Sequence, residues 1–228
     1  MKILIDDANI EAIKKLYPVF PIDGVTTNPS ILAKSGRQPY DVLREIRAFI
    51  GADAELHVQV VGRTADAMLE DVERIHSELG ANTYTKIPVN TAGLEAIKRL
   101  RKAQPSAHIT ATAIYTPMQA FLAAKAGADY TAPYINRIDN LGADGTQTAK
   151  IIQDMFTQNG LPCQILAPSF KNSQQVQELA QYGIGAATIA PAVIEGLVKN
   201  ASVAAAIDDF THDFEALCGA GVTMKNAK

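Results

Sequence analysis

Short apolar runs alternate along this chain with longer stretches whose apolar positions recur every three or four residues. Runs rich in β-branched residues are typical of buried strands, whereas the longer spacing is typical of amphipathic helices. The runs predict strands at 3–6, 24–29, 55–61, 83–89, 108–114, 129–135, 164–169 and 186–190. Helical spacing fills most of the segments between them, and two further helical stretches, at about 193–199 and 203–217, follow the last strand.

This alternation predicts an α/β protein with a parallel sheet covered by helices. Eight strand–helix units in about 220 residues fit a compact (β/α)8 TIM barrel, and an open doubly wound sheet is the second choice. No linker, repeat or low-complexity tract divides the sequence. We therefore expect a single barrel domain over 1–228, with an additional C-terminal helix at about 203–217.

The composition fits a sizeable core and no strongly charged partner. The chain has 228 residues, of which 47% are hydrophobic, and a formal net charge of −3. So small a charge supplies no broad basic field, which argues against nucleic acid as a partner, whereas a phosphorylated sugar needs only a few local donors. No signal-like run precedes the first strand, and no stretch approaches the roughly 18 apolar residues of a membrane helix.

Cysteine and histidine usage points to a reduced compartment without a metal centre. Cys163 and Cys218 lie far apart in the sequence, which favours a cytoplasmic protein over one held by disulfides. The chain contains four histidines, and none of them has the short spacing of metal ligands. We therefore expect no metal site.

One lysine interrupts the strand predicted at 83–89. Alternation places Tyr84, Lys86 and Pro88 on one face, and the apolar character of the other face turns Lys86 toward the barrel interior. A buried ammonium is costly, so such a lysine snorkels, pairs with an acid or loses its proton. A neutral amine beside a carbonyl group forms a Schiff base. A lone strand lysine is more often an edge residue with its charge in water, so the hypothesis of a reactive amine needs further support.

That support comes from polar residues at the carboxyl ends of seven of the eight predicted strands, where barrel active sites lie. They are Asp6, Thr26, Asn28, Gln59, Lys86, Thr110, Thr112, Tyr134, Asn136, Arg137 and Ser169. Singly, each has a structural explanation, such as a helix cap for Asp6 or an Asx-turn for Asn28. Together, hydroxyls, amides, one acid and one lysine suit a polyhydroxylated substrate.

Four segments carry a family resemblance. They are Gly-Val-Thr-Thr-Asn-Pro-Ser at 24–30, Lys-Ile-Pro-Val at 86–89, Ala-Pro-Tyr-Ile-Asn-Arg-Ile-Asp at 132–139 and Ala-Pro-Ser-Phe-Lys at 167–171. Their order and sequence resemble the signatures of the small transaldolase family, from Asp6 to the C-terminal helix. The resemblance implies a (β/α)8 barrel of the class I aldolases that carries its Schiff-base lysine on the fourth strand and needs no metal or other cofactor.

Two subgroups of that family differ at the site. Transaldolases typically have glutamate in place of Gln59 and phenylalanine in place of Tyr134, whereas fructose 6-phosphate aldolases have the glutamine and tyrosine found here. The resemblance therefore implies reversible cleavage of fructose 6-phosphate to dihydroxyacetone and glyceraldehyde 3-phosphate. Transfer of a dihydroxyacetone unit between sugar phosphates is the alternative, and a non-catalytic phosphosugar-binding barrel, against which Lys86 argues, is the third hypothesis.

The resemblance also implies roles for individual residues. Lys86 would attack the ketone carbon, while Asp6 and Asn28 orient the lysine and the substrate hydroxyls. Tyr134 would move protons through a water held by Gln59 and Thr112. The remaining assignments are phosphate binding by Arg137 and Ser169, and substrate binding by Thr26, Thr110, Ala132 and Asn136.

Three residues depart from the aldolase subgroup, and one feature bears on assembly. Thr110, Ala111 and His57 occupy positions where the subgroup carries other residues, so we expect a differently shaped pocket. The resemblance further implies a homo-oligomer, a pentamer or decamer, in which the helix at about 203–217 packs on a neighbouring subunit.

Overall fold

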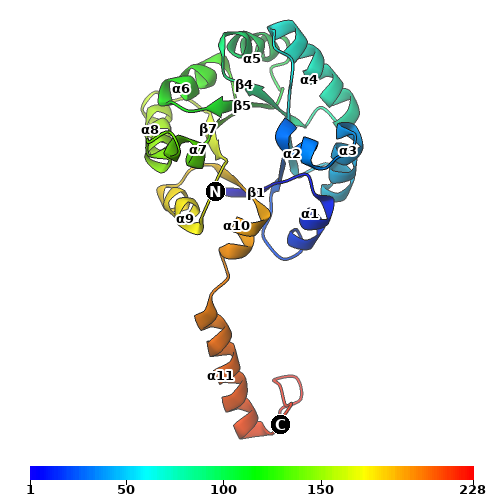
Figure 1. Ribbon diagram of the computed structural model, residues 1–228, viewed down its shortest axis with the longest axis vertical. Helices are drawn as coiled ribbons and strands as arrows, with labels where there is room; N and C mark the ends of the chain where they lie inside the picture. Colours follow the sequence, from blue (N-terminus) through cyan, green and yellow to red (C-terminus); the bar gives the residue numbers. More distant parts are fainter. The chain divides into compact units, whose positions relative to one another are not determined.

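The computed structural model describes residues 1–228, and its eight strands close into a parallel barrel in the order β1 to β8 (Figure 1). Every neighbouring pair is parallel, including β1 with β8. This closure confirms the predicted (β/α)8 barrel and rules out the open doubly wound sheet. The strands are β1 (Lys2–Asp6), β2 (Gly24–Thr26), β3 (Glu55–Gln59), β4 (Tyr84–Pro88), β5 (Ile109–Ile114), β6 (Tyr130–Pro133), β7 (Gln164–Ala167) and β8 (Ala186–Ile189).

Helices surround the barrel and follow the strands in alternation (Figure 1). Two short helices, α2 and α7, lie directly after β2 and β6, ahead of the longer helices of those units. The helices are α1 (Ile10–Leu16), α2 (Pro29–Lys34), α3 (Pro39–Ile50), α4 (Ala65–Leu79), α5 (Thr91–Ala103), α6 (Pro117–Ala126), α7 (Ile135–Asp139), α8 (Gly145–Gln158), α9 (Ser173–Tyr182), α10 (Pro191–Gly196) and α11 (Ala201–Cys218).

Strands β2 and β6 end earlier than their apolar runs predict. Asn28 is already the N-cap of α2, and Pro29 occupies the first helical turn, where its missing N–H costs nothing. Tyr134 likewise precedes α7 instead of continuing β6. The two short helices thus replace the expected ends of these strands, and they carry candidate site residues.

An apolar layer between strands and helices forms the main core. Outward-facing strand residues such as Ile5, Ile87 and Ile109 are fully buried and belong to the same cluster as Ile13 and Ile97 from the helices. Burying one such aliphatic side chain stabilises the fold by about 1.5–3 kcal/mol. Because helices cover one face of the sheet and the closed interior covers the other, the strands read as apolar runs.

The interior of the barrel follows the alternation of β4. Ile87 lies in the outer layer, whereas Tyr84 packs against an inner cluster. Lys86 shares the inner face with Tyr84, and its Cα is paired in register with Gln59 on β3 and Thr110 on β5. The inner cluster consists of Leu4, Tyr130, Leu166 and Ala186.

Gly24 permits the close approach of β2 to β3. A Cβ atom at this position would lie 2.1 Å from the carbonyl oxygen of Glu55, its partner in the strand register. No side chain fits there without moving backbone, so a glycine is needed to close this part of the barrel.

The chain divides into two compact units, Met1–Ile194 and Glu195–Lys228. The first holds the barrel. The second holds α11, whose N-cap Asn200 accepts a hydrogen bond from the Ser202 amide and which has no buried residue. Its exposed side chains include Val203, Ile207 and Phe210. No helix is both long and apolar enough to cross a membrane. The expectation of one domain over 1–228, with α11 on a neighbouring subunit, stays a prediction.

Candidate active site

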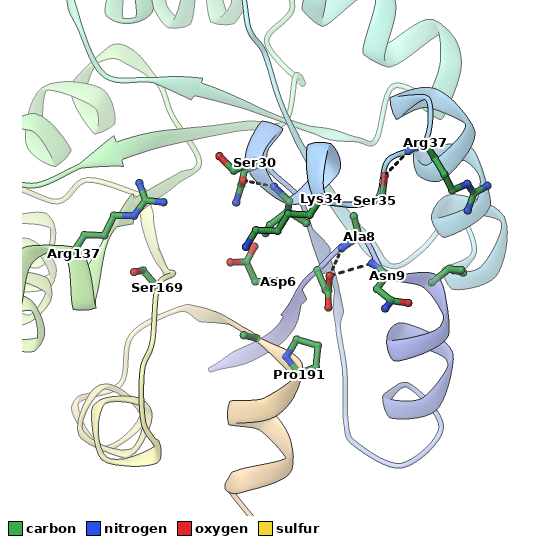
Figure 2. Close-up of a pocket in the computed structure, with 15 residues that line it drawn as sticks. Asp6, Ala8, Asn9, Ser30, Lys34, Ser35, Arg37, Arg137, Ser169 and Pro191 are labelled. Carbon is green, nitrogen blue, oxygen red and sulfur yellow. Dashed lines mark hydrogen bonds between the residues drawn. The ribbon is translucent and has the colours of Figure 1, made fainter.

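A cavity of about 730 Å³ opens at the carboxyl ends of the strands (Figure 2). Four predicted site residues line it: Asp6 after β1, Asn28 before α2, Arg137 in α7 and Ser169 after β7. They are far apart in sequence, but barrel closure brings the strand ends to one rim. A volume of this size is in the range of small-molecule sites.

Lys86 lies in the barrel interior close to this cavity without forming its wall. Its side chain is buried, with 4% of the residue exposed, and Nζ donates a 2.8 Å hydrogen bond to the carbonyl oxygen of Thr27. Burial lowers the pKa of Lys86, and the charge of Asp6 opposes that effect only in part. The amine is therefore deprotonated more readily than an exposed lysine, as a carbonyl nucleophile requires.

Asp6 links Lys86 to the cavity. The Thr26 hydroxyl donates to Asp6 Oδ1 at 2.8 Å, and the same hydroxyl lies 2.7 Å from the hydroxyl of Thr188. Burial raises the pKa of Asp6, while Lys86 and the Thr26 hydrogen bond act in the opposite direction. Burial thus shifts the pKa values of Asp6 and Lys86 toward their neutral forms together, which favours proton exchange between them.

Thr188 was missed by the sequence analysis. It lies on β8, the one predicted strand to which no polar site residue was assigned, and it is 1% exposed. Its spacing of two residues from the inner Ala186 is the signal that would have placed it on the interior face.

Tyr134 and Thr112 meet across β5 and the start of α7. Their hydroxyl oxygens are 3.0 Å apart, and either group can donate. The Arg137 guanidinium lies over the Tyr134 ring, 4.6 Å from its centroid, while the Tyr115 ring meets Tyr134 edge-on at 5.5 Å. This packing fixes the phenol against Thr112 and holds the guanidinium beside the cavity.

Ser169 shares that side of the cavity with Arg137 (Figure 2). Its backbone is in the left-handed region, with φ of 67°, and its carbonyl oxygen accepts a 2.9 Å hydrogen bond from the amide of Asn136. This bond ties the end of β7 to α7, so a cation and a hydroxyl are held on one wall. Backbone strain of this kind is typical of functional sites.

The remaining predicted residues are placed less directly. Asn28 uses its side-chain oxygen to cap α2 through the Ile31 amide, at 3.0 Å, which leaves its NH2 group for other partners. Gln59 is half-buried at the end of β3 beside Lys86 in the register. Ala132 is 2% exposed in β6, and Asn136 is half-buried in α7. Their roles stay predictions.

A buried polar layer lies toward the amino ends of the strands. His57 is fully buried, with Nδ1 2.9 Å from the Thr110 hydroxyl and Nε2 3.2 Å from the carboxylate of Glu55, whose other oxygen Lys2 contacts at 2.5 Å. The Tyr84 ring stacks on His57, with centroids 4.4 Å apart and 10° between the planes. The hydroxyl of Thr110, predicted to bind substrate, is thus paired with His57.

This layer sets the charge states of its members. Burial lowers the pKa of His57 to about 4 despite the opposing pull of Glu55. Burial acts to raise the pKa of Glu55, but the hydrogen bonds from His57 and Lys2 outweigh it and hold the pKa at about 2. His57 is therefore neutral at pH 7, with Nε2–H donating to the ionised carboxylate and Nδ1 accepting from Thr110.

Comparison with known proteins places the sequence among sugar-phosphate enzymes. The sequence profile of the transaldolase/fructose-6-phosphate aldolase family matches residues 3–227. A probable fructose-6-phosphate aldolase of Streptococcus pneumoniae is 38% identical over 215 residues, covering 94% of this chain and 96% of that protein. A probable transaldolase of Exiguobacterium sibiricum is 37% identical over 215 residues, covering 94% and 98%. One of Thermodesulfovibrio yellowstonii is 36% identical over 217 residues, covering 95% and 99%.

Acid should destabilise the protein through His57. Its pKa is about 4 in the folded state against an ordinary 6.5, so its contribution is complete above pH 6.5 and is lost as the pH falls toward 4. Between pH 7 and pH 5, His57 becomes protonated in the unfolded chain but stays neutral in the folded protein. This difference lowers the free energy of unfolding by about 2 kcal/mol. Urea denaturation at the two pH values measures this loss.

The His57→Phe variant retains an aromatic ring but cannot titrate, so its free energy of unfolding should fall about 2 kcal/mol less over the same interval. The His212→Phe variant, altered at an exposed position of α11, serves as the matched control and should keep the wild-type dependence. Equal pH dependence in wild type and His57→Phe would contradict the assignment.

Proposed function

Because the chain belongs to the transaldolase/fructose-6-phosphate aldolase family, we propose that it is a class I aldolase that reversibly cleaves fructose 6-phosphate. The products are dihydroxyacetone and glyceraldehyde 3-phosphate. The observation that carries the proposal is the buried amine of Lys86, whose pKa is lowered by burial and which lies beside Asp6 at the carboxyl ends of the strands.

The chemistry begins at the neutral Lys86 amine. Nζ attacks the C2 carbonyl of the ketose, and loss of water from the carbinolamine gives a protonated imine. Removal of the C4 hydroxyl proton then lets the C3–C4 bond break. Its electron pair moves into the imine to give an enamine, and glyceraldehyde 3-phosphate leaves. The imine is the electron sink, so the proposed reaction requires neither a metal nor another cofactor.

Tyr134 is the proposed acid–base group, and it acts through a water held with Thr112 and Gln59. Its hydroxyl is already paired with Thr112 at 3.0 Å. Protonation of enamine C3, followed by addition of water to the imine, releases dihydroxyacetone and restores the free amine. Asp6 and Asn28 orient Lys86 and the substrate hydroxyls, while Thr26 positions Asp6 through their 2.8 Å hydrogen bond.

Arg137 and Ser169 are the proposed phosphate ligands. The guanidinium presents a planar fork of donors that matches phosphate oxygens, and the serine hydroxyl adds one more donor on the same side of the cavity. Thr110, Ala132 and Asn136 complete the proposed binding surface, with the Thr110 hydroxyl supported by His57.

Transaldolase activity is the second candidate function, because two of the three relatives described above carry that name. It shares every step up to the enamine, which then attacks an aldose phosphate instead of being protonated. The two activities therefore differ in the fate of one intermediate. Gln59 and Tyr134 favour protonation, since they supply donors for a water next to the enamine.

Supplying fructose 6-phosphate alone separates the two activities. Glyceraldehyde 3-phosphate should appear in a coupled assay without any acceptor, since the enamine is protonated and released. Addition of erythrose 4-phosphate should not be required. The Lys86→Met variant, which keeps a long side chain without an amine, should release no product under either condition. Product that appears only with the acceptor would identify a transaldolase, and product formed by Lys86→Met would exclude the imine mechanism.

The Tyr134→Phe variant should lose cleavage more than transfer. Removing the hydroxyl removes the proton donor for the enamine, which costs about 10²-fold in cleavage. Transfer to erythrose 4-phosphate needs no proton at that carbon and should fall less. Parallel assays of both activities give the ratio, and Tyr182→Phe, altered at an exposed tyrosine of α9, is the control. An equal loss of both activities would show that Tyr134 has another role.

We also propose that a second copy of this chain covers the apolar side chains of α11, giving a homo-oligomer. Ile207, Phe210 and Leu217 are 57%, 70% and 82% exposed, which is unusual for large apolar residues of one helix. Light scattering should then give a mass that is a multiple of 24.4 kDa. The Phe210→Lys variant should shift that mass downward, whereas Lys225→Glu, on the same unit, should not. A wild-type monomer would refute the proposal.

A further inference from the structure

A chain of three polar side chains connects strands β8, β2 and β1 inside the barrel. The hydroxyl oxygen of Thr188 on β8 lies 2.7 Å from that of Thr26 on β2, and the Thr26 hydroxyl donates to Asp6 Oδ1 on β1 at 2.8 Å. Asp6 is paired with Thr26 in the strand register, and Thr188 is paired with Leu4 of the inner cluster. The proposed mechanism uses Asp6 and Thr26, and it gives Thr188 no role.

The chemistry of these groups decides which atom donates in each hydrogen bond. A hydroxyl group has one proton, and an ionised carboxylate can only accept. The Thr26 proton is directed to Asp6, so the other hydrogen bond of Thr26 must be donated by Thr188. With Asp6 ionised, the chain therefore runs in one direction, from Thr188 through Thr26 to the carboxylate.

The hydroxyl of Thr188 serves nothing else in the protein. Thr26 is its only hydrogen-bond partner, and the residue is 1% exposed. Valine has nearly the same shape without the hydroxyl, and Val, Ile and Leu ordinarily fill the interior of such a barrel. Because a buried hydroxyl costs free energy unless it is hydrogen-bonded, packing alone favours valine here. The hydroxyl at this position is explained by what it does for Thr26.

Donation by Thr188 makes the Thr26 hydroxyl a better donor to Asp6. In a buried chain of hydrogen bonds each bond polarises the next, and the low dielectric of the interior strengthens the effect. The charge of Asp6 acts on the buried amine of Lys86, so the hold on this carboxylate reaches the proposed nucleophile. We propose that Thr188 is a positioning residue for imine formation, which keeps Thr26 as a donor and thereby fixes the Asp6 carboxylate that acts on Lys86.

This inference rests on the proposed function, and it concerns one of several influences on Asp6. Lys86 of β4 and Arg137 of α7 favour the ionised carboxylate, whereas burial and the charge of Asp7 oppose it. Lys34 of α2 lines the same cavity. Loss of one hydroxyl from β8 leaves all of these in place and weakens only the hydrogen bond to the carboxylate. The pKa of Asp6, which burial already raises, should then rise further.

Titration of Asp6 tests the chain of hydrogen bonds directly. In protein labelled with ¹³C at the aspartate carboxyl groups, the chemical shift of each carboxyl carbon is followed against pH. The Asp6 signal is identified by its loss in the Asp6→Asn variant. The pKa of Asp6 should be higher in Thr188→Val than in the wild type, and Thr188→Ser, which retains a hydroxyl, should titrate as the wild type does.

Trapping of the imine tests the consequence for Lys86. The protein is incubated with dihydroxyacetone and excess cyanoborohydride at a series of pH values, and the adduct on Lys86 is followed by intact mass and peptide mapping. The rate should fall in acid as Asp6 becomes protonated. At the pH where the wild type is half-maximal, Thr188→Val should react about twofold more slowly, because one bond of the chain strengthens the next only in part. Thr131→Val, altered at a buried threonine of β6, is the matched control and should react as the wild type does.

A double-mutant cycle separates this role from packing. Thr26→Val interrupts the chain between Thr188 and Asp6, so adding Thr188→Val to it should change neither the titration nor the trapping rate further. Damage to packing at position 188 would instead add its own effect in that background. Thermal melting checks that each variant is folded.

The outcomes distinguish this inference from the function on which it rests. An unchanged Asp6 titration in Thr188→Val, or an equal effect of Thr188→Val with and without Thr26→Val, would overturn the role of Thr188 and leave the imine mechanism intact. Absence of any adduct on Lys86 in the wild type would overturn the imine mechanism and, with it, any role of Thr188 in imine formation.

Discussion

The structure depends on the burial of one amine inside a closed parallel barrel. Lys86 has almost no contact with solvent, and its Nζ donates to a single carbonyl oxygen. A full charge in that place would cost several kcal/mol, because the interior replaces few of the hydrogen bonds that water supplies. Asp6, at the end of β1, partly offsets this cost through its charge, and burial shifts the pKa values of both groups toward their neutral forms. Because burial disfavours the charged form of Lys86, its amine becomes neutral more readily and can act as a nucleophile.

The buried polar layer around His57 holds the residues next to Lys86 on the side of the barrel toward the amino ends of the strands. Thr110 is next to Lys86 in the strand register, and its hydroxyl is paired with His57. His57 in turn contacts Glu55, whose other carboxylate oxygen contacts Lys2. The layer keeps its net charge low, since the acid is paired and the imidazole is neutral. The layer therefore has little electrostatic effect on the Lys86 amine, and Asp6 is the charged residue that acts on it most directly.

The sequence predicted the elements whose signals are local, and it failed where the signal is spatial. Alternation along 83–89 was enough to place Lys86 inside, because a strand fixes which residues share a face. Strands β2 and β6 were predicted to extend too far. Asn28 and Tyr134 are the N-caps of helices that are too short to show a helical pattern in the sequence. The link between Thr26 and Thr188 joins strands that are neighbours only through β1 and closure of the barrel.

The choice between cleavage and transfer depends on water near the enamine and not on the imine itself. Formation of the imine and breakage of the C3–C4 bond need the same groups in both reactions. What differs is whether a proton or an aldehyde reaches C3 first. Thr112 and the Arg137 guanidinium hold the Tyr134 phenol in one orientation, and such preorganisation of a proposed proton donor lowers the barrier to protonation. The same guanidinium lines the cavity, so in the proposed mechanism the residue that binds the phosphate of the leaving aldehyde also positions the acid that protonates the enamine afterwards.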